Sequence, residues 1–423
     1  MAPLPQRACT LGIFAFNHSD APLQQSRPQP MQNALILTSS LLIAGLLLYP
    51  RLSHAPLWRA TMTPLASIIG SGFLVLGPIL HQSWGASAPL VMAALCAGAW
   101  AFGAAIRSNI AHRSTQPRPI IEQGLETAAS WVLSFAYVIS VAYYLNLFGA
   151  FGVSLTPYGD ALHARLLTSA MFLLILGVGW LRGFDALERL EQVTVGVKLV
   201  VIAGLLAGLA GYFVTQAQAG TLQIIPPQVS LWQSLTLGFG LIVTVQGFET
   251  SRYLSESYDA RVRIRSMQWA QAISTVIYMI YITLLAYAFA PATGALSETA
   301  IIAMMAVVAP ILPAMLVAAA LTAQFSAAIA DTSGAGGLIA ELTRSRVSSR
   351  QAYAVLVGAG LALTWSADVF QIIAYASRAF ALYYALQAAI AASHRDQSAL
   401  RVTAYAGLAV FGLAIAVLGT PIE

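Results

Sequence analysis

The sequence predicts an all-α polytopic membrane protein with about twelve transmembrane helices, given the roughly 20 apolar residues that one span requires. Hydrophobic residues make up 58% of its 423 residues and charged residues only 9%, whereas about 25% of a soluble domain is charged. The mean hydropathy is +0.74, and long apolar stretches recur along the whole chain. The composition therefore excludes a soluble domain.

The apolar stretches define the expected spans. They cover residues 35–49, 61–80, 87–106, 125–155, 166–180, 193–214, 231–248, 269–290, 307–338, 352–365, 369–392 and 402–418. The spans at 35–49, 166–180 and 352–365 are the shortest, each below about 17 residues. Residues 1–30 are rich in Pro, Gln and Ser and precede a second methionine, Met31, so we expect a disordered tail or a start-site artefact there.

Arginines indicate how the spans are oriented. They fall in every second loop, from Arg51 and Arg59 to Arg395 and Arg401, while the intervening loops carry only Arg165. The positive-inside rule places the arginine-bearing loops in the cytoplasm, and a twelve-span count then leaves both termini outside. The net charge of +5 is explained by this topology, so we expect no nucleic-acid partner.

Cysteines and histidines give no sign of a metal or redox centre. Cys9 lies in the polar tail and Cys96 in an apolar span, which is not a disulfide framework or a metal-ligand spacing. The histidines, among them His54, His112 and His394, are scattered over span ends and loops. We expect no metal site and no cofactor. An integral-membrane enzyme would need carboxylates or histidines clustered on one loop face, and the sequence displays no such cluster.

Two spans are interrupted by glycines at matching positions. Residues 68–73 read Ile-Ile-Gly-Ser-Gly-Phe, and residues 238–240 and 243–249 read Gly-Phe-Gly and Val-Thr-Val-Gln-Gly-Phe-Glu. Each glycine weakens a helix by about 1 kcal/mol relative to Ala, and unwound backbone is tolerated at membrane depth only beside protein or a wet cavity. Paired breaks predict an inverted-repeat transporter with its site at the midplane. The alternative is that the glycines merely permit close helix packing.

This pattern predicts a five-plus-five inverted repeat. The first repeat covers residues 59–216 and the second 230–394, with an extra N-terminal helix at 31–52 and an additional C-terminal helix at 400–423. A five-helix offset reverses the orientation of the second repeat in the membrane, as an inverted repeat requires.

With these motifs the chain resembles the amino acid-polyamine-organocation (APC) transporter superfamily, which shares the fold of the bacterial leucine transporter. The resemblance spans residues 61 to about 392. It is carried by residues 69–73, by Gly-Phe-Glu at 247–249, by Lys198, and by Ser326 followed by Gly-Ala-Gly at 334–336. The family usually has Asn-Pro-x-Arg after its sixth helix, whereas residues 258–263 here keep the arginine and lack the proline.

The resemblance implies a substrate site at the two breaks. Backbone and hydroxyl donors near a half-helix N-terminus would bind a carboxylate, and acceptors at the second break would bind an amino group. The implied residues are Gly70, Ser71, Gly72, Val243, Thr244 and Gln246. Thr244 and Gln246 could equally satisfy the broken backbone themselves. Of Tyr143 and Tyr144, which point about 100° apart on a helix, we expect at most one to line the site, and Tyr143 is our candidate.

Lys198, the chain's single lysine, lies inside an apolar span. The resemblance implies that its ammonium replaces a sodium ion between the first and eighth helices, held by the carbonyls of Ala66 and Ile69 and the hydroxyl of Ser326. Desolvation disfavours the charged form, which predicts proton coupling rather than sodium coupling. The alternative is that the long side chain snorkels to the cytoplasmic headgroups.

Three further charged positions lie at membrane depth. Glu249 and Arg252, three residues apart on a continuing helix, can face each other and could serve gating or proton sensing, or form a structural pair. Asp331 is a candidate proton or cation site, or a residue of the cytoplasmic vestibule. Arg378 should face the bundle interior and pair with an acid, with direct substrate contact as the alternative.

Together these features predict a secondary active transporter of a small solute, an amino acid or related amine, driven by protons through alternating access. Its partners would be that substrate, protons and the lipid bilayer, and its location a bacterial inner (plasma) membrane. The alternatives are an inorganic-ion transporter of the same fold, an ion channel and a non-transporting membrane subunit.

The orientation can be tested by single-cysteine labelling in a background that lacks Cys9 and Cys96. An impermeant thiol reagent applied to intact cells should spare Thr115→Cys and modify Gly220→Cys, because the rule places the first loop inside and the second outside. The reverse labelling pattern would mean that the topology is inverted.

Overall fold

The computed structural model describes residues 29–70, 72–113, 120–181, 185–254, 257–290, 296–394 and 397–422, and this part of the chain contains helices and no strand. The longer helices are α1 (Gln29–Leu48), α3 (Pro56–Ile68), α4 (Gly72–Trp84), α5 (Ala88–Arg113), α6 (Ile120–Val153), α7 (Ala161–Leu181), α8 (Asp185–Ala219), α9 (Leu231–Gly240), α10 (Ala260–Ala288), α11 (Ala300–Val308), α12 (Leu312–Leu342), α13 (Ser349–Ser366), α14 (Val369–Ser393) and α15 (Ala399–Leu418). The short ones are α2 (Pro50–Ser53), η1 (Gly85–Ser87), η2 (Ile242–Val245) and η3 (Phe248–Tyr253).

Nine segments of the described chain are long and apolar enough to cross a membrane. The prediction of an all-α polytopic membrane protein is thus confirmed. Both spans that the glycines were expected to interrupt are broken: the first divides into α3 and α4, and the second into α9, η2 and η3. Residues 1–28, the expected tail, lie outside the described residues.

The predicted start of the span at residues 307–338 is wrong. The stretch 307–338 is not one helix, because α11 ends at Val308 and α12 begins at Leu312. Between them Ala309 is extended, with φ −160° and ψ 139°. Pro310 follows it, and a residue before proline is driven out of the helical region by a clash with the proline ring. Hydropathy alone does not detect such a break.

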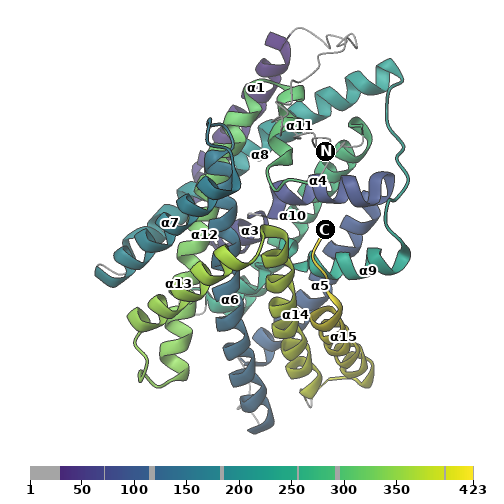
Figure 1. Ribbon diagram of the computed structural model, residues 1–423. Helices are drawn as coiled ribbons and strands as arrows, with labels where there is room; N and C mark the ends of the chain where they lie inside the picture. The colour runs from purple at the N-terminus through teal and green to yellow at the C-terminus, as the bar shows by residue number, and fades with distance from the viewer. Residues whose placement is uncertain are drawn as a thin grey trace, which may run out of the picture.

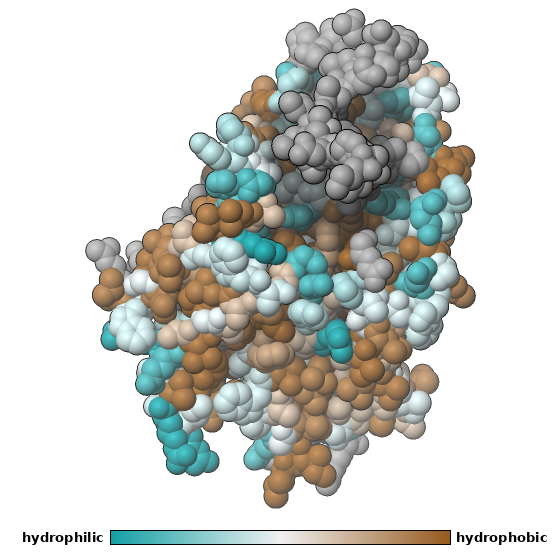
Figure 2. All heavy atoms as spheres, in the orientation of Figure 1, coloured by the Kyte–Doolittle hydropathy of each residue, from teal (hydrophilic) through white to brown (hydrophobic). Residues whose placement is uncertain are grey.

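Helices from distant parts of the chain pack around α6 and α14 (Figure 1). α6 lies against α12, α14 and α7, and α5 lies against α10 and α14. α1 packs on α8 and α15 on α14, at the periphery of the bundle. The outer surface is apolar, as Figure 2 shows by its wide hydrophobic areas, and it exposes side chains such as Leu42, Val355 and Val410. A surface of this kind requires lipid around it.

Candidate functional site

The two interrupted helices touch at their breaks. Ile69 follows the end of α3, and its φ of −86° and ψ of 47° lie outside the helical region. Gly247, at the start of η3, has a φ of 113°. A Cβ on Gly72 would lie 2.8 Å from the Cα of Thr244, and one on Gly247 would lie 2.8 Å from the backbone nitrogen of Ile68. Glycine is therefore required at both points, because the two backbones meet there without room for a side chain. Ser71 lies outside the described residues.

Two buried hydroxyls from other helices satisfy the freed backbone. Tyr278 of α10 places its Oη 2.9 Å from the Ile68 carbonyl and 2.6 Å from the Thr244 carbonyl, so that it bridges the two breaks. Ser377 of α14 accepts a hydrogen bond from the Val243 N–H at 3.1 Å and donates one to the Gly240 carbonyl at 2.7 Å. Neither residue was expected at the site. The sequence feature that could have indicated them is a hydroxyl side chain in the middle of an apolar span.

Thr244 and Val243 form hydrogen bonds to neighbouring residues of the second break. The Thr244 hydroxyl donates to the Leu241 carbonyl at 2.6 Å, and the Val243 carbonyl accepts from the Gln246 N–H at 3.2 Å. The Thr244 hydroxyl therefore pairs with a carbonyl of the broken helix, which is one of the two alternatives expected for this residue.

A small polar cavity lies beside the breaks. Its volume is about 20 Å³, enough for one water molecule. The polar residues in its lining come from α3, α6, α8, the second break and α12. They are Ser67, Tyr144, Lys198, Gln246, Glu249, Thr250, Ser326 and Asp331. Two larger hollows of about 560 and 700 Å³ are lined mainly by apolar side chains, which suits them to lipid rather than to a polar solute.

Lys198 is buried, with only 6% of its surface exposed. Its Nζ donates a hydrogen bond of 2.9 Å to the carbonyl of Ala66, in the last turn of α3. This is one of the expected contacts, and it rules out snorkelling to the headgroups. Ser326 lines the same cavity, and its Oγ accepts from the Thr194 hydroxyl at 3.3 Å. Ile69 is also buried, at the end of α3.

Tyr144 lines this cavity, whereas Tyr143, the residue expected at the substrate site, does not. Gln246 donates from its Nε2 to the Tyr144 hydroxyl at 3.0 Å. The turn of α6 directs Tyr143 elsewhere into the core, where it is 1% exposed. The Oε1 of Gln246 is buried and has no hydrogen-bond partner within the described part of the chain. This oxygen is an acceptor beside the cavity.

The expected pairing of Glu249 with Arg252 is wrong. Glu249 folds back on the break, where its Oε2 accepts from the Gly247 N–H at 2.9 Å and from the Tyr384 hydroxyl at 2.8 Å. The left-handed turn at Gly247 leaves that N–H without a helical acceptor, and the carboxylate takes it. Arg252 instead forms an ion pair with Glu126 of α6.

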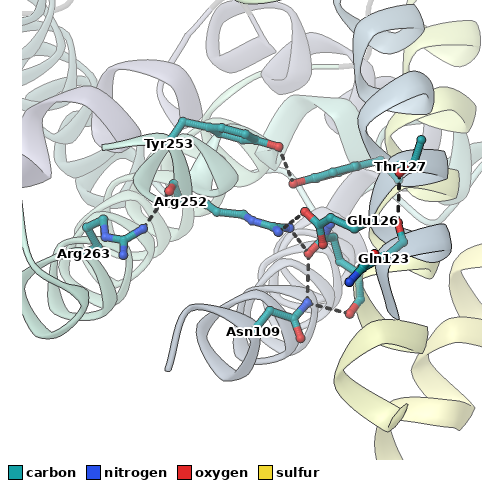
Figure 3. Close-up of polar contacts among 9 residues, drawn as sticks. Asn109, Gln123, Glu126, Thr127, Arg252, Tyr253 and Arg263 are labelled. Atoms are coloured by element: carbon teal, nitrogen blue, oxygen red, sulfur yellow. Dashed lines mark hydrogen bonds and ion pairs between the residues drawn. The ribbon is translucent and has the colours of Figure 1, made fainter. Parts of the chain in front are cut away.

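Arg252 belongs to a buried network that joins α5, α6, η3, α10 and α14 (Figure 3). Besides Glu126, it contacts the side-chain oxygen of Gln387. Asn109 donates to the same oxygen at 2.9 Å, and Arg263 donates to the Arg252 carbonyl at 2.8 Å. Nothing in the sequence paired Glu126 with Arg252, because their contact depends on how α6 packs against the second break.

The two remaining charged candidates differ in position. Asp331 accepts a hydrogen bond from the Ser140 hydroxyl of α6 and lines the cavity. Arg378 is exposed, and its Nε donates to the Ala416 carbonyl of α15 at 2.7 Å. The expectation of an interior arginine paired with an acid is wrong. Arg378 lies on the face of α14 that is directed to the peripheral helix α15, and not on the face directed to the interior of the bundle.

Two histidines and a glutamate that are remote in sequence come together at one end of the bundle. His112, Glu122 and His394 hold their ligand atoms within 4.8 Å of one another. The positions of these residues along the sequence gave no sign of this grouping. Spacing along the chain could not reveal this group, since each residue lies at the end of a different helix.

A bundle of apolar helices with two broken helices that meet at their breaks, and a small polar cavity beside them, is the architecture of a membrane transporter. The comparisons agree with this class. Residues 50–419 match the model of a family described as APC superfamily transporter, and the chain belongs to that superfamily. An uncharacterized protein of Aquifex aeolicus (strain VF5) is 40% identical over 375 residues, which cover 85% of this chain and 91% of that protein.

The bridge made by Tyr278 can be tested with Tyr278→Phe. Loss of the hydroxyl leaves two buried carbonyls without their donor, which should cost about 1–3 kcal/mol and lower the melting temperature of the detergent-purified protein. Tyr281→Phe is the matched control, because the Tyr281 hydroxyl lies 3.5 Å from its nearest carbonyl, that of Leu74. Equal melting temperatures for the two variants would contradict a bridging role.

Proposed function

We propose that the protein is a secondary active transporter that moves an amino acid or a related amine by alternating access and uses protons as the coupling ion. The observation that carries this proposal is the buried Lys198 ammonium on the Ala66 carbonyl. It stands beside the first break and within the same cavity as two carboxylates, Glu249 and Asp331.

Lys198 supports proton coupling through its charge. A carbonyl at the end of a broken helix favours a cation, and here the protein supplies one from its own side chain. Loss of the proton would remove that charge and weaken the hold of α8 on α3. Protonation can thus bias the position of the first broken helix, without a need for sodium.

The breaks offer complementary groups to a zwitterion. The N-terminus of α4, which begins at Gly72, carries a partial positive charge suited to a carboxylate. The Oε1 of Gln246 and the carboxylate of Asp331 can accept hydrogen bonds from an amino group. A cavity of about 20 Å³ is too small for an amino acid, so the proposed cycle requires the helices around it to separate toward one side at a time.

The small cavity also favours a second candidate, an inorganic-ion transporter of the same fold. Its volume suits a water molecule or a small ion, and Glu249 and Asp331 supply carboxylates. Uptake of labelled rubidium, sodium or chloride without any amino acid would favour this candidate.

Proteoliposomes test the proposal. A labelled amino acid pool should accumulate when the pH gradient is directed inward, and replacement of sodium by choline should change nothing. Lys198→Ala should abolish accumulation yet retain exchange of substrate down its own gradient, because the lysine holds the cation position rather than the substrate. The control is Arg401→Ala, which removes an exposed positive charge at the start of α15.

A strong sodium requirement, or full accumulation by Lys198→Ala, would contradict the role of the lysine. Coupling would then have to be sought at Glu249 or Asp331. Absence of amino acid uptake under every gradient would contradict the substrate class.

Glu249 is the proposed proton sensor, because its carboxylate holds the second break through Gly247 and Tyr384. Glu249→Gln keeps an oxygen that can accept both hydrogen bonds and removes the titration. We expect a flattened pH dependence of uptake with a smaller change in the maximal rate. Glu341→Gln, at an exposed position of α12, is the control. An unchanged pH profile would assign Glu249 to structure alone.

A further inference from the structure

Three potential metal ligands meet where α5, α6 and α14 end together. His112 lies in the last turn of α5, Glu122 in the first turn of α6, and His394 directly after α14. Their ligand atoms lie within 4.8 Å of one another. Glu122 is 5% exposed and His394 only 3%. A carboxylate and two imidazoles, the usual N and O ligands of a protein-bound metal ion, are thus gathered in one small and largely buried space.

The donor set points to a transition metal. Two imidazole nitrogens and one carboxylate oxygen are ligands of Zn²⁺ in sites that leave a fourth position to water. The hard cations Mg²⁺ and Ca²⁺ prefer six or more oxygen ligands. Tetrahedral zinc holds its ligand atoms about 3.3 Å apart. The rings of His112 and His394 are stacked with centroids 3.9 Å apart, so the two imidazoles already lie side by side next to Glu122.

His394 also has the outer contacts of a metal ligand. Its Nδ1 lies 3.1 Å from the Nε2 of Gln397, which also donates to the Ser108 hydroxyl at 2.7 Å. An amide turned by half a rotation has the same shape, and that rotation places its oxygen here, where it accepts from both groups. That contact fixes the ring and leaves Nε2 for the metal, which is the usual support of a zinc-bound histidine.

We propose that His112, Glu122 and His394 bind one Zn²⁺ ion, which ties together the ends of α5, α6 and α14. The proposed ion site involves three of the helices that also take part in the buried network of Arg252. Asn109 is three residues from His112, Glu126 four from Glu122, and Gln387 seven from His394. The ion therefore reinforces a junction that the network already closes.

The position of the proposed zinc site implies that zinc regulates transport. Zinc bound here holds three helices together at the end that the arginine loops assign to the cytoplasm, and so it inhibits any cycle in which that end opens. This consequence rests on the proposed transport function. Zinc binding itself does not, and it can be measured without transport.

The test uses the full-length protein, purified without a polyhistidine tag and stripped with a chelator. Zn²⁺ added in competition with a chromogenic chelator should bind in a one-to-one ratio, and a tenfold excess of Mg²⁺ should not displace it. His112→Ala, Glu122→Gln and His394→Ala should each weaken binding at least tenfold. The matched controls are His54→Ala and His163→Ala, whose histidines lie at exposed positions outside the cluster.

A second measurement separates lost ligation from lost folding. Zinc should raise the melting temperature of the wild type and of the controls but not of the three variants. His394→Cys, which retains a zinc ligand, should restore binding. Stoichiometric binding that is unchanged in all three variants, or no binding by the wild type, would overturn the proposal. Binding without inhibition of uptake would overturn the regulatory consequence and leave the site in place.

Discussion

The structure depends on one constraint: no backbone N–H or C=O group can stay unpaired inside a bilayer. Both breaks interrupt helical pairing inside apolar spans, and the protein compensates by placing them in contact. Gly72 and Gly247 allow the backbones to meet, while Tyr278 and Ser377 supply the missing hydrogen bonds. α10 and α14 are therefore bound to the breaks by specific bonds as well as by packing.

Charge gathers at the breaks for the same reason. A helix end with unpaired backbone groups carries a partial charge. This partial charge stabilises an ion of opposite sign, which would be unfavourable in lipid. Lys198 uses the end of α3, and Glu249 uses the N–H freed at Gly247. The Lys198 contact joins α8 to α3, and the Tyr384 hydroxyl joins Glu249 to α14, so a change of protonation alters how these elements are held together. This link between charge and helix position supports the proposed coupling.

At one end of the bundle, polar contacts form two successive layers. The inner layer is the network around Arg252 and Glu126, and the outer layer is the cluster of His112, Glu122 and His394. Both layers draw on α5, α6 and α14. The two layers thus place polar contacts between the same three helices over successive turns.

The sequence by itself determined the membrane class, most spans, both breaks and the contact of Lys198 with Ala66, because hydropathy, glycine placement and a family motif are local signals. Only the tertiary structure decided that Tyr144 lines the cavity, that Arg252 pairs with Glu126, and that the ligands of the proposed zinc site meet. These outcomes depend on which face of one helix meets another. In a uniformly apolar helix, hydropathy does not distinguish the faces, so packing alone selects the partner.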